Sequence, residues 1–205
     1  MSIDPSRFHV TNVADTCAVW NILSSDVLHS AAKKAGCTFV VTGVVQYELA
    51  IKPRTESKPS DNELRHRLRK EQDAGGFSSI PCSIEDLRAV TALEARRKLG
   101  KGELSSIALA MRLYMAVITD DRKATKLARE AGHADMTQTT PHLLAWLDFN
   151  DALSDTDKQL ILHQHAGLNG TLGGPFKDAI VMAQRCKANA TSQALPAFPQ
   201  RSLID

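Results

Sequence analysis

The sequence predicts an α/β protein built on a parallel sheet and followed by a helical C-terminal extension. Through the first two thirds of the 205 residues, short apolar segments alternate with segments of helical periodicity, as expected for strands joined by crossover helices. Acidic residues stand just after several of the apolar segments, at the edge where open parallel sheets bind ligands. Hydrophobic residues make up 43% of the chain and aromatic residues only 5%, so the core must be mainly aliphatic.

The elements of the α/β part are expected in alternation, with glycines or polar caps at their ends. Ser83 and Asp86 have the spacing of a capping box at the start of one helix. The polar segment Thr55–Asn62 is expected to be a loop. Strands are predicted over Phe8–Ala14, Thr38–Thr42, Ser79–Cys82 and Ala116–Thr119. Helices are predicted over Cys17–Ala35, Val44–Ala50, Glu63–Asp73, 84 to about 99, Leu104–Leu113 and Asp121–Ala131.

The character of the chain changes after residue 138. Three helices are expected there, His142–Phe149 after Thr140-Pro141, Ser154–His165 and Phe176–Asn189, with a glycine-rich loop before the last. We therefore expect an α/β domain over residues 1–138, a helical extension over residues 139–190 and a flexible tail over residues 191–205.

Composition narrows the function classes only in part. The formal net charge is +2 and the sequence pI is about 8.4, which is compatible with nucleic-acid binding without indicating it. The four cysteines are widely spaced, which argues against a zinc site or a disulfide scaffold. No secretory signal and no membrane-spanning apolar segment is recognisable. These features favour a cytoplasmic protein that has no membrane association.

The acidic residues near the predicted strand ends are the candidate functional group: Asp15, Glu48, Glu103, Asp120 and Asp121. Each also has an ordinary structural explanation. Asp15 and the aspartate pair can cap the helices that follow them. Glu48 can lie on a solvated helix face, and Glu103 can stabilise a helix N-terminus through the helix dipole.

The combination of these acids indicates more than any one of them. In a right-handed parallel α/β sheet, the strand C-termini lie along one edge, where these side chains would converge. Carboxylates gathered without cations repel one another, and Mg²⁺ or Mn²⁺ is the kind of ion that would relieve the repulsion. Such sites suit phosphoryl transfer.

Two segments around the later acids are similar to motifs of the PIN-domain family of metal-dependent ribonucleases. Residues 102–110 read GELSSIALA and residues 117–124 read VITDDRKA, which resemble the GE-x-x-x-x-ALA and TDD-x-x-A signature of that family. Asp15-Thr16 after an apolar strand resembles the first family motif, and Glu48 within VVQYEL resembles the second. The resemblance covers about residues 10–135.

The resemblance implies a three-layer α/β/α fold and an acidic cluster that binds Mg²⁺ or Mn²⁺. The implied catalytic residues are Asp15, Glu48, Glu103 and Asp121. The same acids and Asp120 are the implied metal ligands, with Thr119 in support. Spacing from Thr119 favours Asp121 over Asp120 as the ligand, although both stay open.

The function implied by the resemblance is an endoribonuclease that cleaves RNA phosphodiester bonds with a metal-activated water. The resemblance also implies that the protein could be the toxin of a toxin–antitoxin pair, with an antitoxin protein as its partner. A homodimer is a further implied partner arrangement. The alternative is a non-catalytic module on the same fold that binds nucleic acid or protein. Phosphoaspartate receivers and haloacid-dehalogenase-like phosphatases fit less well, because both place paired acids after the first strand.

Basic side chains near these motifs are candidate contacts to the RNA backbone: Lys52, Arg54, Arg65, Arg69, Arg122 and Lys123. Solvated helix faces with ion pairs at i,i+4 are the structural alternative. His163 and His165 are expected to be surface residues, and Trp20 and Trp146 are expected to lie in the core.

Overall fold

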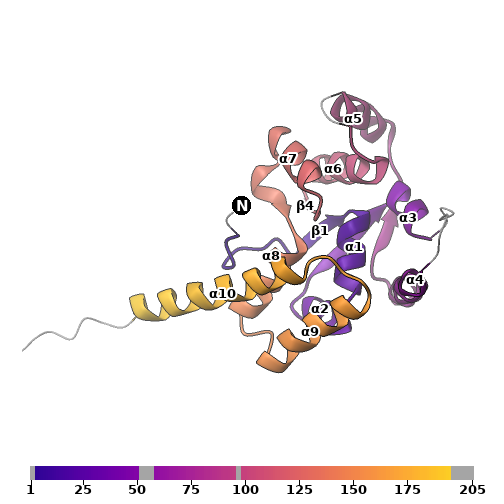
Figure 1. The fold of residues 1–205 in the computed structure, drawn as a ribbon. Coiled ribbons are helices and arrows are strands. Elements are labelled where there is room, and N and C mark those ends of the chain that lie inside the picture. The colour runs from indigo at the N-terminus through magenta and orange to yellow at the C-terminus, as the bar shows by residue number, and fades with distance from the viewer. Residues whose placement is uncertain (1–2, 51–57, 96–97, 195–205) are drawn as a thin grey trace, which may run out of the picture.

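A computed structural model describes residues 3–50, 58–95 and 98–194 of the chain. Within them a single sheet has five strands, all parallel, in the order β3-β2-β1-β4-β5 (Figure 1). Val13 of the central strand pairs with Val40 on one side and Val117 on the other. The strands are β1 (Thr11–Ala14), β2 (Thr38–Thr42), β3 (Ser78–Ile80), β4 (Ala116–Ile118) and β5 (Thr137–Gln138).

Alternation along the strands divides the core into two, one on each face of the sheet. Ala14 and Ile118 face a core shared with α1 (Thr16–Leu23) and α2 (Asp26–Lys34). Their neighbours Val13 and Val117 face a second core. The helices that supply the second core are α5 (Ile84–Glu94), α6 (Lys101–Leu113) and α7 (Arg122–Glu130). The three-layer α/β/α fold with a parallel sheet is confirmed.

Two further helices lie beside the first core. They are α3 (Gly43–Ala50) and α4 (Pro59–Asp73). Arg67 of α4 donates to the carbonyl of Leu23 at 3.1 Å and pairs with Asp26 at 3.1 Å. These bonds tie α4 to the end of α1 and the start of α2.

The C-terminal helices pack on the sheet and share its first core. They are α8 (Thr140–Phe149), α9 (Asp155–Gly167) and α10 (Gly173–Ala194), and Figure 1 shows α10 reaching away from the sheet. Leu144, Ile161 and Phe176 belong to the same hydrophobic cluster as Ala14. No helix in the described ranges is long and apolar enough to cross a membrane.

Two predictions in the N-terminal half of the chain, one of a helix and one of a loop, are wrong in detail. The helix expected over residues 17–35 is two helices, because Ser25 caps α2 through a bond from the Leu28 amide. The loop expected over Thr55–Asn62 is helical from Pro59, a residue well suited to the first turn because it has no N–H to satisfy. Residues 55–57 lie outside the described residues.

Other boundaries shift in the same way. Helix α5 ends at Glu94 rather than near residue 99, although the predicted Ser83–Asp86 capping box is present. Helix α10 begins at Gly173 and continues to Ala194, into the expected tail. Strand β5 has no counterpart among the predicted strands, because two polar residues carry no apolar signal.

Candidate functional site

Asp15 lies at the C-terminal end of β1 and is fully buried. Its Oδ1 accepts a hydrogen bond from the Ala18 amide at 2.7 Å, so the residue caps α1. Its Oδ2 accepts a hydrogen bond from the hydroxyl of Thr119, the residue after β4. Asp15 is therefore both a helix cap and a buried carboxylate held between two adjacent strands.

The electrostatic setting of Asp15 is unfavourable for its charge. Burial, together with the neighbouring charges of Asp120 and Glu103, raises the pKa of Asp15 to about 7, against hydrogen bonds that lower it. Desolvation and the charges of Asp15, Glu103, Asp120 and Asp121 likewise raise the pKa of the nearby Cys17 thiol to about 12. The structure thus brings these four acids into one region of negative potential.

Glu48 approaches the same region from α3. Its Oε2 accepts a hydrogen bond from the Thr16 hydroxyl at 2.7 Å, and Thr16 follows Asp15 directly. Gly102 lies so close that a Cβ there would collide with the Glu48 carboxylate and approach the Thr16 hydroxyl to 3.1 Å. Glycine at this position therefore lets the first turn of α6 pack against Glu48.

The first turn of α6 is fixed to the end of β2 by hydroxyl groups. The hydroxyls of Thr42 and Ser105 lie 2.8 Å apart, and Ser105 also donates to the Gly102 carbonyl at 2.9 Å. Glu103 is in this turn, and its carboxylate folds back against Gly100. Buried hydroxyls thus position the helix that carries Glu103.

Asp120 and Asp121 have different surroundings although they are adjacent. Asp120 Oδ1 accepts from the Thr140 amide at 2.8 Å, while Oδ2 accepts from the Thr140 hydroxyl at 2.6 Å and from Asn21 at 2.8 Å. Burial nevertheless raises the pKa of Asp120. Asp121 caps α7 through Oδ1 alone, which accepts from the amides of Lys123 and Ala124 at 2.7 and 2.8 Å.

The donor set has the chemistry of a site for a hard divalent cation. It consists of carboxylate oxygens from the ends of β1 and β4, from α3 and from α6. Burial is the main cause of the raised pKa of Asp15, and the charges of Asp120 and Glu103 add to it. In the described part of the chain, no three His, Cys, Asp or Glu side chains are gathered closely enough to enclose an ion. The oxygen donors fit an ion of the Mg²⁺ type, which needs only one or two carboxylates and takes its other ligands from water.

The predicted RNA-contact residues have mixed positions. Lys52 and Arg54 lie outside the described residues. Arg65 donates from Nε to the Leu49 carbonyl at 3.2 Å, which gives it a structural partner. The others, Arg69, Arg122 and Lys123, are exposed.

Three residues of the site were given no functional role in the sequence analysis. Thr16 bonds Glu48, while Asn21 and Thr140 hold Asp120. Thr140 comes from the C-terminal part of the chain, and no local pattern links it to an acid twenty residues earlier. For Thr16, the sequence did offer a signal, because this residue directly follows Asp15.

Comparison with known proteins adds one match. A family model described as PIN domain matches residues 13–130, more than half of the chain. This range contains every acid of the candidate site and ends before α8. No curated protein and no solved structure matches the chain.

Proposed function

Because the chain belongs to the PIN domain family, whose members are metal-dependent nucleases, we propose that it is a Mg²⁺- or Mn²⁺-dependent endoribonuclease. The observation that carries the proposal is the buried Asp15 carboxylate, whose pKa is raised to about 7 in a group of other acids. A buried charge of this kind is costly to stability, and strongly perturbed carboxylates concentrate at functional sites. A bound cation would offset that cost.

We assign the metal site to Asp15, Glu48, Glu103 and Asp121, of which one or two would contact the ion directly and the others would bind its water ligands. When bound, the ion would lower the pKa of a water molecule and neutralise charge that develops on the phosphate. Asp15 reaches the site already oriented, because Ala18 and Thr119 fix its two oxygens. Glu48 is oriented in the same way by Thr16.

Asp120 has a positioning role in this proposal. Three donors already bind its two oxygens, and two of them come from Thr140. The hydrogen bonds of Asp121 involve Oδ1, which leaves Oδ2 for the ion. The bonding pattern therefore favours Asp121 over Asp120 as the ligand.

The direct test is cleavage of structured and unstructured RNAs by the purified protein with Mn²⁺ or with EDTA. We expect cleavage that needs Mn²⁺ and falls by about 10³-fold or more in Asp15→Asn, as for other residues at the reacting centre. Asp73→Asn is the matched control, because Asp73 is exposed at the end of α4. Equal cleavage by Asp15→Asn and the wild type would refute the assignment.

The toxin role and the non-catalytic alternative need further tests. A toxin would arrest growth on expression, and arrest would require Asp15 and be relieved by a co-expressed partner. A protein that binds RNA but cleaves none with Mn²⁺ would support the non-catalytic alternative on the same fold.

A further inference from the structure

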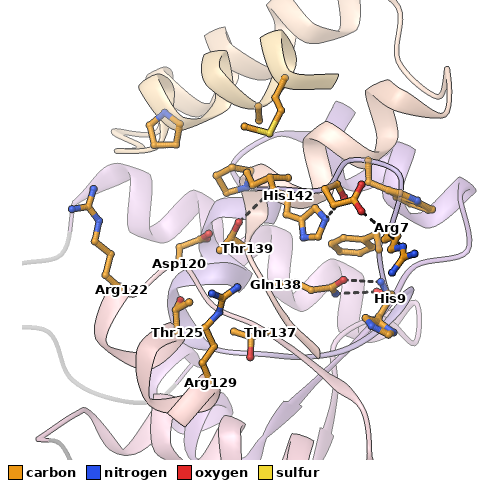
Figure 2. Close-up of a pocket in the computed structure, with 18 of the residues that line it drawn as sticks. Arg7, His9, Asp120, Arg122, Thr125, Arg129, Thr137, Gln138, Thr139 and His142 are labelled. Atoms are coloured by element: carbon orange, nitrogen blue, oxygen red, sulfur yellow. Dashed lines mark hydrogen bonds and ion pairs between the residues drawn. The ribbon is translucent and has the colours of Figure 1, made fainter. Parts of the chain in front are cut away.

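A groove of about 1670 Å³ runs beside the acidic site. One wall is α7, the floor is β5 with the Thr139 that follows it, and the other side is formed by the N-terminal segment, α8 and α10 (Figure 2). Asp120 lines the groove, and it is the neighbour in sequence of Asp121 and a member of the acidic group around Asp15. The four acids that we assign to the metal do not line the groove, which therefore lies beside the proposed place of cleavage.

Helix α7 presents a basic stripe to this groove. Arg122, Lys126 and Arg129 line it at spacings of four and three residues, which places them on one side of the helix. The stripe is about 10 Å long at the usual helical rise, and it starts next to Asp121, the cap of α7. Figure 2 shows Arg122 and Arg129 extending from this helix into the space that α10 borders.

In the described ranges of the chain, Arg122 and Arg129, the two arginines of the stripe, lack the acidic partners that Arg112 and Arg67 have. Neither Arg122 nor Arg129 has an ion pair or side-chain hydrogen bond with the residues that the structure describes. Arg112, by contrast, binds the buried Asp86 through two bonds of 2.7 and 3.0 Å. Arg67 is bound to Asp26 at 3.1 Å. The guanidinium groups on α7 are therefore available to an external anion.

The groove also holds acids, and they limit where an anion can bind. Asp4 faces Arg7 at 3.8 Å, and Glu130 faces Lys126 at 4.0 Å, so these charges largely offset one another. Asp120, Asp135 and Asp178 also line the groove, so its acids and its lysine and arginine side chains are nearly balanced in number. Of these cations, Arg122 and Arg129 are the two without an ion pair among the described residues, and they are where an anion can bind.

The side of the groove formed by the N-terminal segment and α8 is aromatic. Phe8 stacks on Trp146 with ring centroids 5.3 Å apart, and His142 meets Phe8 edge to face at 5.4 Å. Both Phe8 and Trp146 are half-buried and line the groove. Aromatic surfaces opposite a basic stripe suit a single strand, whose unpaired bases can stack while its phosphates meet cations.

We propose that this groove binds single-stranded RNA, with phosphates on Arg122 and Arg129 and bases towards the aromatic side. The strand would pass from the groove to the acids beside Asp120. The inference rests on the proposed nuclease function, since it names the path of that substrate. It also gives the C-terminal helices a function, because α8 and α10 form part of the groove wall.

The test is the affinity of the full chain for a short fluorescent single-stranded RNA, measured by anisotropy in EDTA at several salt concentrations. Arg122→Gln/Arg129→Gln is compared with Lys34→Gln/Arg88→Gln, which removes the same charge from exposed positions on α2 and α5. The groove variant should bind about five- to tenfold more weakly than the control. Its plot of log K against log salt should be less steep by about 1.4, for two lost phosphate contacts on a single strand.

Equal affinities and equal salt slopes for the two double variants would overturn the proposal, as would tighter binding to a duplex than to the single strand. Loss of binding to a co-purifying protein, with RNA affinity unchanged, would assign the groove to a protein partner instead. Mn²⁺-dependent cleavage is scored separately. Cleavage with no groove effect would refute only the groove, and a groove effect without cleavage would refute only the nuclease function.

Discussion

Two buried aspartates, one in the C-terminal helices and one at the sheet edge, are treated differently by the fold. Asp148 of α8 lies 3.2 Å from the buried ammonium group of Lys158 and 3.8 Å from that of Lys187. Asp15 has hydrogen bonds from an amide and a hydroxyl but no cationic partner in the described residues. The fold can place a lysine against a buried carboxylate, and among the described residues none is placed beside Asp15, where the cation of our proposal would take that role.

The largest effect expected from this difference is on how stability depends on pH. The pKa of Asp15 is about 7 in the folded protein against an ordinary value of 3.8, so between these values the folded chain holds a proton that the unfolded chain has lost. The wild type should therefore lose stability relative to Asp15→Asn as pH rises through this window, by up to about 4 kcal/mol in total.

Urea unfolding of the metal-free wild type and Asp15→Asn, from about pH 5 to about pH 8, measures the part of this loss that falls above pH 5, about 3 kcal/mol. Subtracting the free energy of unfolding of one protein from that of the other cancels the contribution of His29, His142 and His165, which both proteins share. That contribution has the opposite pH dependence, because burial lowers the pKa values of these histidines. A difference that does not change with pH would contradict the account of Asp15.

The converse experiment removes a cation from the helical region. Lys158→Met leaves Asp148 buried with only the more distant Lys187, and should lower the free energy of unfolding by about 3 kcal/mol. Lys126→Met is the control, because its ion pair with Glu130 is exposed and 4.0 Å long, and it should cost less than about 0.5 kcal/mol. Equal losses in urea unfolding would mean that Lys158 does not neutralise Asp148.

A smaller effect is expected where the two regions meet, at the bond between Thr140 and Asp120. Thr140→Val keeps the amide but removes the hydroxyl that binds Asp120 Oδ2. Loss of one such bond should slow cleavage by about tenfold, or 1.4 kcal/mol. Thr140→Ser should restore the rate.

Three quantities separate a positioning role from a structural one: kcat, the affinity for Mn²⁺ and the midpoint of thermal unfolding, all measured for each variant. A positioning role lowers kcat with little change in the midpoint. A parallel fall in kcat and in the midpoint for both Thr140 variants would assign the residue to stability alone.

The sequence was sufficient for those features that local patterns encode. The four longer strands, the order of the helices and the positions of the acids all follow from apolar segments, caps and spacing. The break between α1 and α2 was encoded in the cap residue Ser25, but the apolar periodicity that continues across it concealed it. The start of α4 was encoded in the first-turn residue Pro59, but the polar composition of the segment predicted a loop.

Long-range contacts could not be obtained in this way. Strand β5 consists of Thr137 and Gln138, and it is a strand only because it pairs with β4. Asn21 and Thr140 meet Asp120 across 99 and 20 residues of sequence. The raised pKa of Asp15 depends on burial by several elements, which no local pattern reports.

The measurement that tests the central claim most directly is Mn²⁺ binding, followed by electron paramagnetic resonance of the free ion as metal-free protein is titrated. The account predicts saturable binding by the wild type, abolished or greatly weakened in Asp15→Asn and unchanged in Asp73→Asn. Binding that is the same in all three proteins, or absent from the wild type, would contradict the claim that the sheet edge keeps the Asp15 charge for a divalent cation.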